Sequence, residues 1–342
     1  MTSREIVKRT LEFRSPLRIP RHLWHLPWAS DHFPRELARI QADFPDDIVY
    51  APLFFKKPPP TSGDEYAPGT FIDEWGCIFE NRQKGIIGEV KEPLLKSWQD
   101  LARVRPPLGR LSLDVDQVNV FCRSTDNYVL AGCRVRPFEQ LQFIRKSENL
   151  YLDLAERPKE LFILLDRVHK FYLEELELWA RTEVDGLLFS DDWGGQRSLL
   201  ISPAQWRTLF KPLYKEYVEI AHRSGKAMFM HSDGYIMDII PDLVEIGVDA
   251  LNAQVFCMDI ESLGELFRGK ITFWGEIDRQ HILPYGTPED VRAAVKRVWA
   301  SLYDHGGVIA QCEFGIGAKP ENIRLVFETW NRFAVASPSP FA

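Results

Sequence analysis

The chain has 342 residues, of which 45% are hydrophobic and 27% charged, a balance typical of a globular protein that buries a large core. A net charge of -7 and the lack of a long Lys/Arg block argue against nucleic acids and acidic membranes as partners, so a small molecule or another protein is favoured. No apolar run is long enough to span a membrane, the start lacks a signal-peptide pattern and the five cysteines include no close CxxC pair, so we expect a cytoplasmic protein without a disulfide framework.

The first predicted feature is an aromatic segment near the start of the chain. His22, His25 and His32 lie in it, but none is paired with an acid in a metal-binding pattern. Trp24 and Trp28 lie among them and indicate an aromatic wall. We therefore do not expect these histidines to bind a metal.

A small insertion is predicted next. Pro-rich stretches at residues 56–60 and 105–107 bracket the sequence FIDEWGCIFENRQKGIIGEV, whose short apolar runs are separated by glycines. Such a pattern indicates a β-rich insertion, which we place near the entrance of the fold. Nothing after residue 110 resembles a linker, so we predict one domain over residues 1–342.

The second half of the chain alternates between predicted strands and helices. Ser202 and Pro203 open one helix that ends at Gly225, and Thr287 starts another that stops before Gly306. Five apolar runs without polar alternation predict buried parallel strands, at residues 184–189, 226–230, 248–253, 271–276 and 307–312. This alternation predicts an α/β fold that is either a closed barrel or an open doubly wound sheet.

Polar side chains at the ends of these strands favour the closed (β/α)8 TIM barrel, with an N-terminal extension. In a barrel such side chains meet at one mouth, whereas an open sheet brings a ligand to its switch point, and the glycine-rich phosphate loop of such sheets is missing. The residues concerned are Asp191, Asp192, His231, Asp233, Asn252, Gln254, Glu276, Cys312 and Glu313.

The segment FMHSDG predicts a metal site. His231 and Asp233 are two residues apart, so at a strand end both side chains can address one ion. Cys312 ends the last predicted strand, and imidazole, carboxylate and thiolate together would suit Zn²⁺. Three alternatives stay open: Asp233 caps a helix, His231 is satisfied by hydrogen bonds, and Cys312 is a small buried hydrophobic residue.

The loop at residues 188–203 predicts substrate binding. Asp191 and Asp192 face different directions, so one of them is expected to point into the mouth. Trp193 would supply an apolar wall and Gln196 an amide. The alternative is a loop that only caps the helix after Ser202.

Further polar residues complete the expected site. Asn252 and Gln254 are expected to bind substrate, and Glu276 is expected to act as a catalytic acid or base with Asp191 and Asp192. Glu276 or Glu313 could be a further metal ligand or a general base. Alternatively, either could pair with an arginine of the barrel.

Several motifs together resemble the uroporphyrinogen decarboxylase superfamily over nearly the whole chain. They are DEWGC (73–77), DDWGGQRSLLISPAQWRTLFKP (191–212), HSDG (231–234), DALNAQ (249–254), FWGEID (273–278) and KPENIR (319–324). The resemblance implies a (β/α)8 barrel. It also implies either porphyrinogen decarboxylation or zinc-dependent transfer of a methyl group between a corrinoid protein and a thiol.

Two departures from family patterns narrow these expectations. Residues 21–30 lack the RQAGR motif of the decarboxylases, so the methyltransferase branch is favoured. In that branch zinc is held by His-x-Cys and a later Cys, which match His231 and Cys312, whereas Asp233 stands where the middle Cys is expected. The chain has no DxHxxG corrinoid motif, so the resemblance implies a corrinoid carried by a separate protein.

Three hypotheses follow from the sequence. The first is a zinc-dependent methyltransferase or demethylase that acts on a small methylated compound. The second is a decarboxylase or lyase without a metal, in which Arg134 or Arg136 holds an acidic substrate. The third is a barrel that binds a small ligand and has lost catalysis. A homodimer is the expected assembly for an enzyme of this size.

Overall fold

Eight parallel strands form an almost closed barrel. The computed structural model describes residues 1–333, and the strand order in its main sheet is β1-β11-β10-β9-β8-β7-β6-β2. Neighbouring strands in this order pair in parallel. The strands are β1 (Arg21–His25), β2 (Ile48–Tyr50), β6 (Tyr128–Leu130), β7 (Gly186–Ser190), β8 (Ala227–Ser232), β9 (Ala250–Ala253), β10 (Thr272–Trp274) and β11 (Val308–Phe314). The predicted TIM-like barrel is confirmed.

The first and last strands of the sheet, β1 and β2, are linked by the side chains of two successive residues, Asp46 and Asp47. The backbone N–H of Asp47 donates to the carbonyl of Arg21 over 2.8 Å. In return, the N–H of Arg21 donates to the Asp47 carboxylate over 2.8 Å, and the N–H of Leu23 donates to Asp46 over 2.6 Å. Side chains therefore satisfy backbone donors where a strand ladder is missing.

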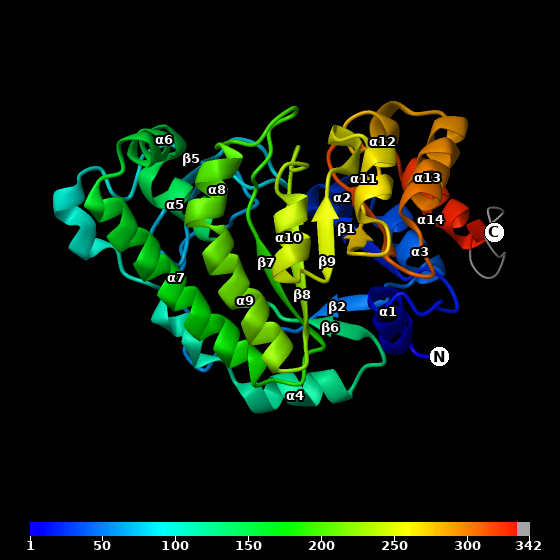
Figure 1. Ribbon diagram of the computed structural model, residues 1–342, viewed down its shortest axis with the longest axis horizontal. Helices are drawn as coiled ribbons and strands as arrows, with labels where there is room; N and C mark the ends of the chain where they lie inside the picture. Colours follow the sequence, from blue (N-terminus) through cyan, green and yellow to red (C-terminus); the bar gives the residue numbers. More distant parts are fainter. Residues whose placement is uncertain (334–342) are drawn as a thin grey trace.

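Helices surround the barrel, with α7 and α9 on one side and α13 and α14 on the other (Figure 1). Residues 1–333 contain no helix whose length and hydropathy would suit a membrane crossing. The α-helices are α1 (Ser3–Leu11), α2 (Pro27–His32), α3 (Pro34–Asp43), α4 (Val115–Arg123), α5 (Pro137–Arg145), α6 (Ser147–Glu156), α7 (Lys159–Ala180), α8 (Pro203–Leu209), α9 (Lys211–Arg223), α10 (Ile240–Ile246), α11 (Ile260–Phe267), α12 (Ile282–Tyr285), α13 (Pro288–Leu302) and α14 (Pro320–Trp330).

The barrel interior is a small apolar core closed by the N-terminal extension. Val7 of α1 packs with inward-facing strand residues, among them Tyr128, Phe229, Trp274 and Ile309. A larger core outside the barrel joins the opposite faces of the same strands to the helices. Because successive strand residues point to opposite faces, the apolar residues along a strand alternate largely between the two cores, as Val308 and Ala310 (outer) do with Ile309 (inner).

Most predicted elements are found where they were expected, with one helix as an exception. The predicted helix after Ser202 is two helices, α8 and α9, because Pro212 in the first turn of α9 cannot donate a backbone hydrogen bond to the preceding turn. Helix α13 begins as predicted, with Thr287 and Asp290 forming a capping box, and ends at Leu302.

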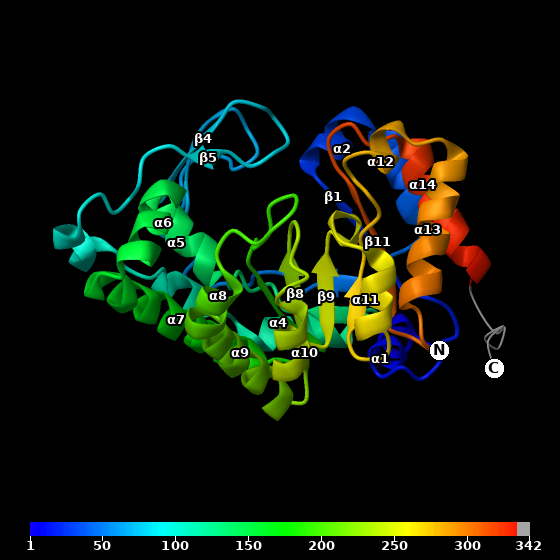
Figure 2. The ribbon, with the colours of Figure 1, turned by 45° about the horizontal axis from the view of Figure 1, so that its top comes forward.

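The predicted β-rich insertion is a three-stranded antiparallel sheet of β3 (Gly69–Ile72), β4 (Ile78–Asn81) and β5 (Glu89–Val90). Figure 2 shows β4 and β5 on the side to which β8 and β9 point, across from α2. The β4–β5 turn (residues 82–88) reaches α2, since Lys84 pairs with Asp31 at 2.9 Å. The insertion therefore lies over the mouth of the barrel, at the carboxyl ends of the strands.

Candidate metal centre at the barrel mouth

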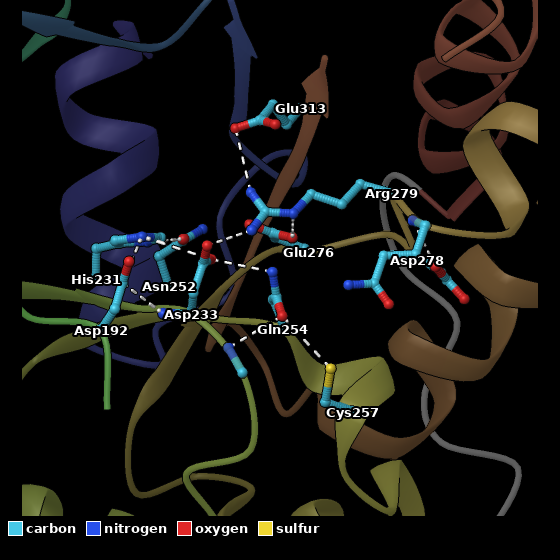
Figure 3. Close-up of polar contacts among 12 residues, drawn as sticks. Asp192, His231, Asp233, Asn252, Gln254, Cys257, Glu276, Asp278, Arg279 and Glu313 are labelled. Carbon is cyan, nitrogen blue, oxygen red and sulfur yellow. Dashed lines mark hydrogen bonds and ion pairs between the residues drawn. The ribbon is translucent and has the colours of Figure 1, made fainter. Parts of the chain in front are cut away.

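Three side chains from neighbouring strand ends converge at the mouth. Asp192 follows β7, His231 is in β8 and Asp233 follows it, and the register pairs Ser190 with His231. Nε2 of His231 lies 3.5 Å from Oδ1 of Asp192 and 3.6 Å from Oδ1 of Asp233. Dashed lines in Figure 3 join the imidazole to both carboxylates. One donor atom of each residue lies within 4.8 Å of the others, which is close enough for the three to hold one metal ion.

The orientation of the His231 ring is set by Asn252 on β9. Nδ1 of His231 lies 2.6 Å from Oδ1 of Asn252, and the amide nitrogen of Asn252 donates to the carbonyl of Trp274. That second bond fixes which amide atom faces the ring, so Nδ1 must carry the proton. Nε2, which faces the two carboxylates, is then the nitrogen that a metal ion can bind in place of a proton.

Close contact between two loops explains the glycines in the motifs DDWGG and HSDG. The N–H of Gly194 donates to the carbonyl of Asp233 over 3.0 Å. A Cβ added to Gly234, whose φ is +77°, would lie 2.1 Å from the carbonyl oxygen of Gly194. Only glycine allows this approach, which holds the residues after β7 and β8 together.

Gln254 and Arg279 hold Asp233 from two sides. The Gln254 amide donates to Oδ1 of Asp233 over 3.1 Å and accepts from the N–H of Gly234 over 3.0 Å. Arg279 donates to the other oxygen, Oδ2. Gln254 is thus a residue that positions Asp233, rather than a free amide awaiting substrate.

Arg279 lies among three carboxylates and was not identified from the sequence (Figure 3). It is 3.3 Å from Glu313 and 3.7 Å from Glu276, in addition to its bond with Asp233. The sequence could have indicated Arg279 by its position three residues after Glu276 in FWGEIDRQ. The segment is a loop, however, and no periodicity predicts where a loop side chain points. The alternative in which Glu276 and Glu313 pair with an arginine is therefore observed.

The electrostatics of the mouth favour a cation. Burial disfavours the charged form of His231, but the carboxylates of Asp192 and Asp233 outweigh it and raise the pKa of the imidazole. Burial raises the pKa of Glu276 to about 7, and one of its oxygens has no hydrogen-bond partner among residues 1–333. Three acids surround Arg279 and Asp192 adds a fourth beside His231, so the mouth carries negative charge that a bound metal would compensate.

The wall beside the metal centre is aromatic. The ring centroid of Trp24 lies 5.3 Å from that of His231 and 5.1 Å from that of Trp274. His22 stacks on Trp274, and burial lowers its pKa to about 3, so it stays neutral. Trp24 thus forms the aromatic wall expected from the sequence, while Trp28 stacks on His32 in α2.

Gln196 lies beside the centre as the sequence predicted. It lines a pocket of about 160 Å³ with Gln254, Glu276 and Arg279. The side chain is exposed and is 3.9 Å from the sulfur of Cys257, which also lines the pocket. Gln196 is therefore free to contact a ligand.

Asp191, predicted to be catalytic, has a structural position instead. Its carboxylate accepts from the N–H groups of Phe138 and Glu139 over 3.0 and 2.8 Å, and from the hydroxyl of Tyr214 over 2.5 Å. It is completely buried, so it satisfies the first turn of α5 and does not face the mouth. Asp192 is the acid of this pair that points to the centre, where it was expected to be catalytic rather than a metal ligand.

Trp193 was predicted to line the substrate site and does not. It is fully buried, stacks on Phe138 at 4.0 Å between ring centroids and donates to Tyr214 over 2.8 Å. Asn252 likewise contacts His231 instead of open space. Trp193 therefore faces away from the mouth, whereas Asn252 points inward but its amide is already bonded to His231 and to the carbonyl of Trp274.

The prediction that Cys312 binds the metal is wrong, because Cys312 lies on the outer face of its strand. Gln311 and Glu313 point to the inside of β11, with Glu313 reaching Arg279, so Cys312 points outward. It is completely buried in the outer core, and burial raises the pKa of the thiol well above its usual value. The group of side chains that could hold a metal contains Asp192 in place of this sulfur.

Comparisons with known proteins agree with this architecture. The family model described as uroporphyrinogen decarboxylase (URO-D) matches residues 72–333. No curated protein matches the sequence significantly. A solved structure titled as a methyltransferase from Methanosarcina mazei is 14% identical and covers 98% of this chain and 100% of its own, with a TM-score of 0.66. A solved structure of a 3-keto-D-glucoside 4-epimerase from E. coli is 13% identical. The match covers 69% of this chain and 94% of the epimerase, and its TM-score is only 0.41.

Proposed function

Because the chain belongs to the uroporphyrinogen decarboxylase family, we propose that it is a zinc-dependent methyltransferase or demethylase of that family. It would move a methyl group between a small substrate or thiol and a corrinoid protein. The observation that carries the proposal is the convergence of Asp192, His231 and Asp233 on one point at the barrel mouth. The similar fold of a protein named as a methyltransferase supports the choice of reaction.

The donor set fits zinc. Zn²⁺ accepts imidazole nitrogen and carboxylate oxygen and, in catalytic sites, keeps one position open beside three protein ligands. Asn252 holds His231 in the required tautomer, while Gln254 and Arg279 keep Asp233 directed at it. With Cys312 outside the set the site is harder than a thiolate site, so binding of manganese or iron is the alternative result that a metal assay would reveal.

The residues around the centre have distinct tasks in this mechanism. Zinc, when bound, supplies a Lewis acid that lowers the pKa of a substrate heteroatom. The free oxygen of Glu276, on a carboxyl whose burial raises its pKa to about 7, can take up or release the proton of that heteroatom near neutral pH. Trp24 packs against the imidazole of His231 and shields one side of it from water.

A corrinoid protein is proposed as the second partner, because the chain has no corrinoid-binding motif of its own. It would dock over the mouth, to bring its cofactor to the substrate. A metal-free decarboxylase or lyase is a second candidate, favoured by Arg134 and Arg136 near the mouth. The two candidates differ in their need for a metal.

Metal analysis of the purified protein tests the proposal. We expect about one zinc per chain in the unaltered protein, and loss of that zinc in His231→Ala and Asp192→Ala. His222→Ala is the matched control, since this exposed histidine near the end of α9 pairs with Asp249, before β9 and away from the mouth. Full activity of a metal-free preparation would support the decarboxylase instead, and absence of stoichiometric metal from every preparation would contradict the zinc proposal.

A turnover assay tests the reaction itself. Methylcobalamin and 2-mercaptoethanol serve as probes: the thiolate attacks the methyl carbon, and the Co–C electron pair stays on cobalt, giving Co(I) and a thioether. We expect a rate above the uncatalysed one with the zinc-loaded protein, and none with His231→Ala. Ligand binding without turnover of any methyl donor would favour a barrel that has lost catalysis.

A further inference from the structure

A second cavity lies beside the metal centre, between the small sheet and the ends of β6 and β7. Its volume is about 460 Å³, which is in the range of small-molecule sites. Ser190, the residue that pairs in register with His231, lines it, and so does Glu139 at the start of α5. The cavity therefore opens beside the three candidate metal ligands.

Two arginines after β6, Arg134 and Arg136, place cations in the cavity, and the acids Glu65, Asp73 and Glu139 also line it. The guanidinium of Arg136 lies 4.8 Å from the ring centroid of Phe143, and the salt bridges within residues 1–333 include none to Arg136. Arg134 reaches Glu65 at 3.4 Å, a long contact with one nitrogen. Arg136 thus has donors left for an anionic ligand, and its planar fork matches a carboxylate.

Next to Arg136 the cavity has an aromatic wall. Phe71 of β3 and Phe79 of β4 line the cavity with Phe143, and the rings of Phe79 and Phe143 meet edge to face at 5.1 Å. Aromatic rings arranged in this way suit a planar apolar body stacked or packed against them.

A buried carboxylate oxygen marks a further contact for a ligand. Asp73 lines the cavity and is 3% exposed. Its Oδ1 accepts from the N–H groups of Trp75 and Cys77 over 3.0 and 2.7 Å, whereas Oδ2 has no partner within the described residues. A buried acceptor without a partner costs free energy, which a hydroxyl or amine of a ligand would recover.

From these contacts we propose that the cavity binds an aromatic carboxylate, with its acid group on Arg136 and Arg134 and its ring against the three phenylalanines. The inference deepens the proposed function, because it names the substrate class for the same mouth. The other end of the molecule would then face Asp192 and His231. No binding residue of this cavity is a proposed metal ligand, so the two ideas can be tested separately.

Calorimetric titration with benzoate, 3-hydroxybenzoate and 4-hydroxybenzoate, each beside its neutral amide, tests the proposal. We expect at least one acid to bind about tenfold or more tightly than its amide, since a charged hydrogen bond contributes about 1.5–3 kcal/mol and 1.4 kcal/mol is tenfold. Arg136→Gln should remove this preference and Arg136→Lys should keep part of it. Arg123→Gln, which alters an exposed arginine paired with Glu183 at the other end of the barrel, should keep it all.

The same titrations with His231→Ala separate this inference from the zinc proposal. We expect the acid-over-amide preference to persist without metal. Equal binding of every acid and amide, or a preference that survives in a folded Arg136→Gln protein, would overturn the aromatic carboxylate inference even if zinc binds. If the unaltered protein binds no zinc but keeps the acid-over-amide preference, the aromatic carboxylate inference is supported and the zinc proposal is not.

Discussion

Oδ1 of Asn252 lies 2.6 Å from Nδ1 of His231 and is the atom that decides which imidazole nitrogen faces the two aspartates. Asn252 cannot rotate freely, because its amide nitrogen donates to the carbonyl of Trp274. The strand β9 therefore controls a donor atom on β8, although Asn252 itself does not reach the metal position.

We expect Asn252→Leu to weaken zinc binding by about 10–100-fold, the usual effect of losing such an outer partner of a ligating histidine. Leucine has a similar volume but accepts no hydrogen bond, so the imidazole is free to change tautomer and orientation. Competition with a zinc-binding dye measures the affinity. Asn119→Leu is the control, because Asn119 in α4 likewise accepts one hydrogen bond through Oδ1, from the backbone N–H of Glu183. Equal zinc affinity in the two variants would show that Asn252 does not orient the ligand.

The adjacent residues Asp191 and Asp192 should give opposite results when each is replaced by alanine. Asp191→Ala leaves two buried N–H groups and a tyrosine hydroxyl without an acceptor, so we expect a loss of roughly 2–4 kcal/mol of unfolding free energy with zinc binding per folded chain retained. Asp192→Ala should lose zinc with little change in the stability of the metal-free protein. Chemical denaturation and metal analysis together check both; similar losses of stability would contradict the assignment.

Cys312→Ala should keep its full zinc content. The sulfur belongs to the outer core, so we expect only the modest loss of stability that follows from removing a small buried group, about 1 kcal/mol. Metal analysis of Cys312→Ala, with Glu313→Ala measured in parallel, compares a residue on the outer face of β11 with its neighbour on the inner face. Loss of zinc in Cys312→Ala alone would restore the thiol to the metal site.

Strand ends explain how far the sequence could predict this site. Apolar runs and turn residues predict the strands of the second half, and the polar residues after them predict the mouth. The side to which each residue points is a different question, since a shift of one position moves a side chain from the mouth to the outer core, as with Cys312 and Glu313. Asp191 and Asp192 could be separated only once α5 was known to begin against the first of them.

Arg279 and the cavity around Arg136 (the arginine cavity) could not be predicted from the sequence for another reason, although the sequence did suggest Arg134 or Arg136 as a contact for an acidic substrate. Arg279 lies in a loop after β10, where no periodicity fixes the side-chain direction, yet it joins three carboxylates. The cavity is formed by the small sheet packing beside β6, and such a contact between distant segments has no local pattern.

Asp46 should make stability depend on pH. Burial raises the pKa of its carboxyl in the folded protein from 3.8 to about 7, so the folded state binds more protons than the unfolded state between these values. The stabilisation is therefore fully present below about pH 4 and is lost as the pH rises through 7. Asp46→Asn keeps an acceptor for the N–H of Leu23 but does not titrate. We expect the Tm of this variant, relative to the unaltered protein, to rise between pH 5.5 and 8.5. A constant difference would contradict the pKa assignment.

Gly85→Ala should loosen the β4–β5 turn (residues 82–88) over the mouth. Gly85 has a φ of +87°, and an added Cβ would lie 2.7 Å from Cα of Trp28, so alanine would push the turn away from α2. Ile87 of this turn lines the arginine cavity, so its displacement would also open that cavity. We expect faster amide hydrogen exchange in residues 82–88 and 27–32, with β8 and β9 unchanged. Gly69→Ala is the matched control, because Gly69 also has a positive φ, +126°, but its added Cβ would meet nothing within 4 Å. Since both variants carry backbone strain and only Gly85→Ala carries the clash, equal exchange in the two would show that the contact with Trp28 does not hold the turn over the mouth.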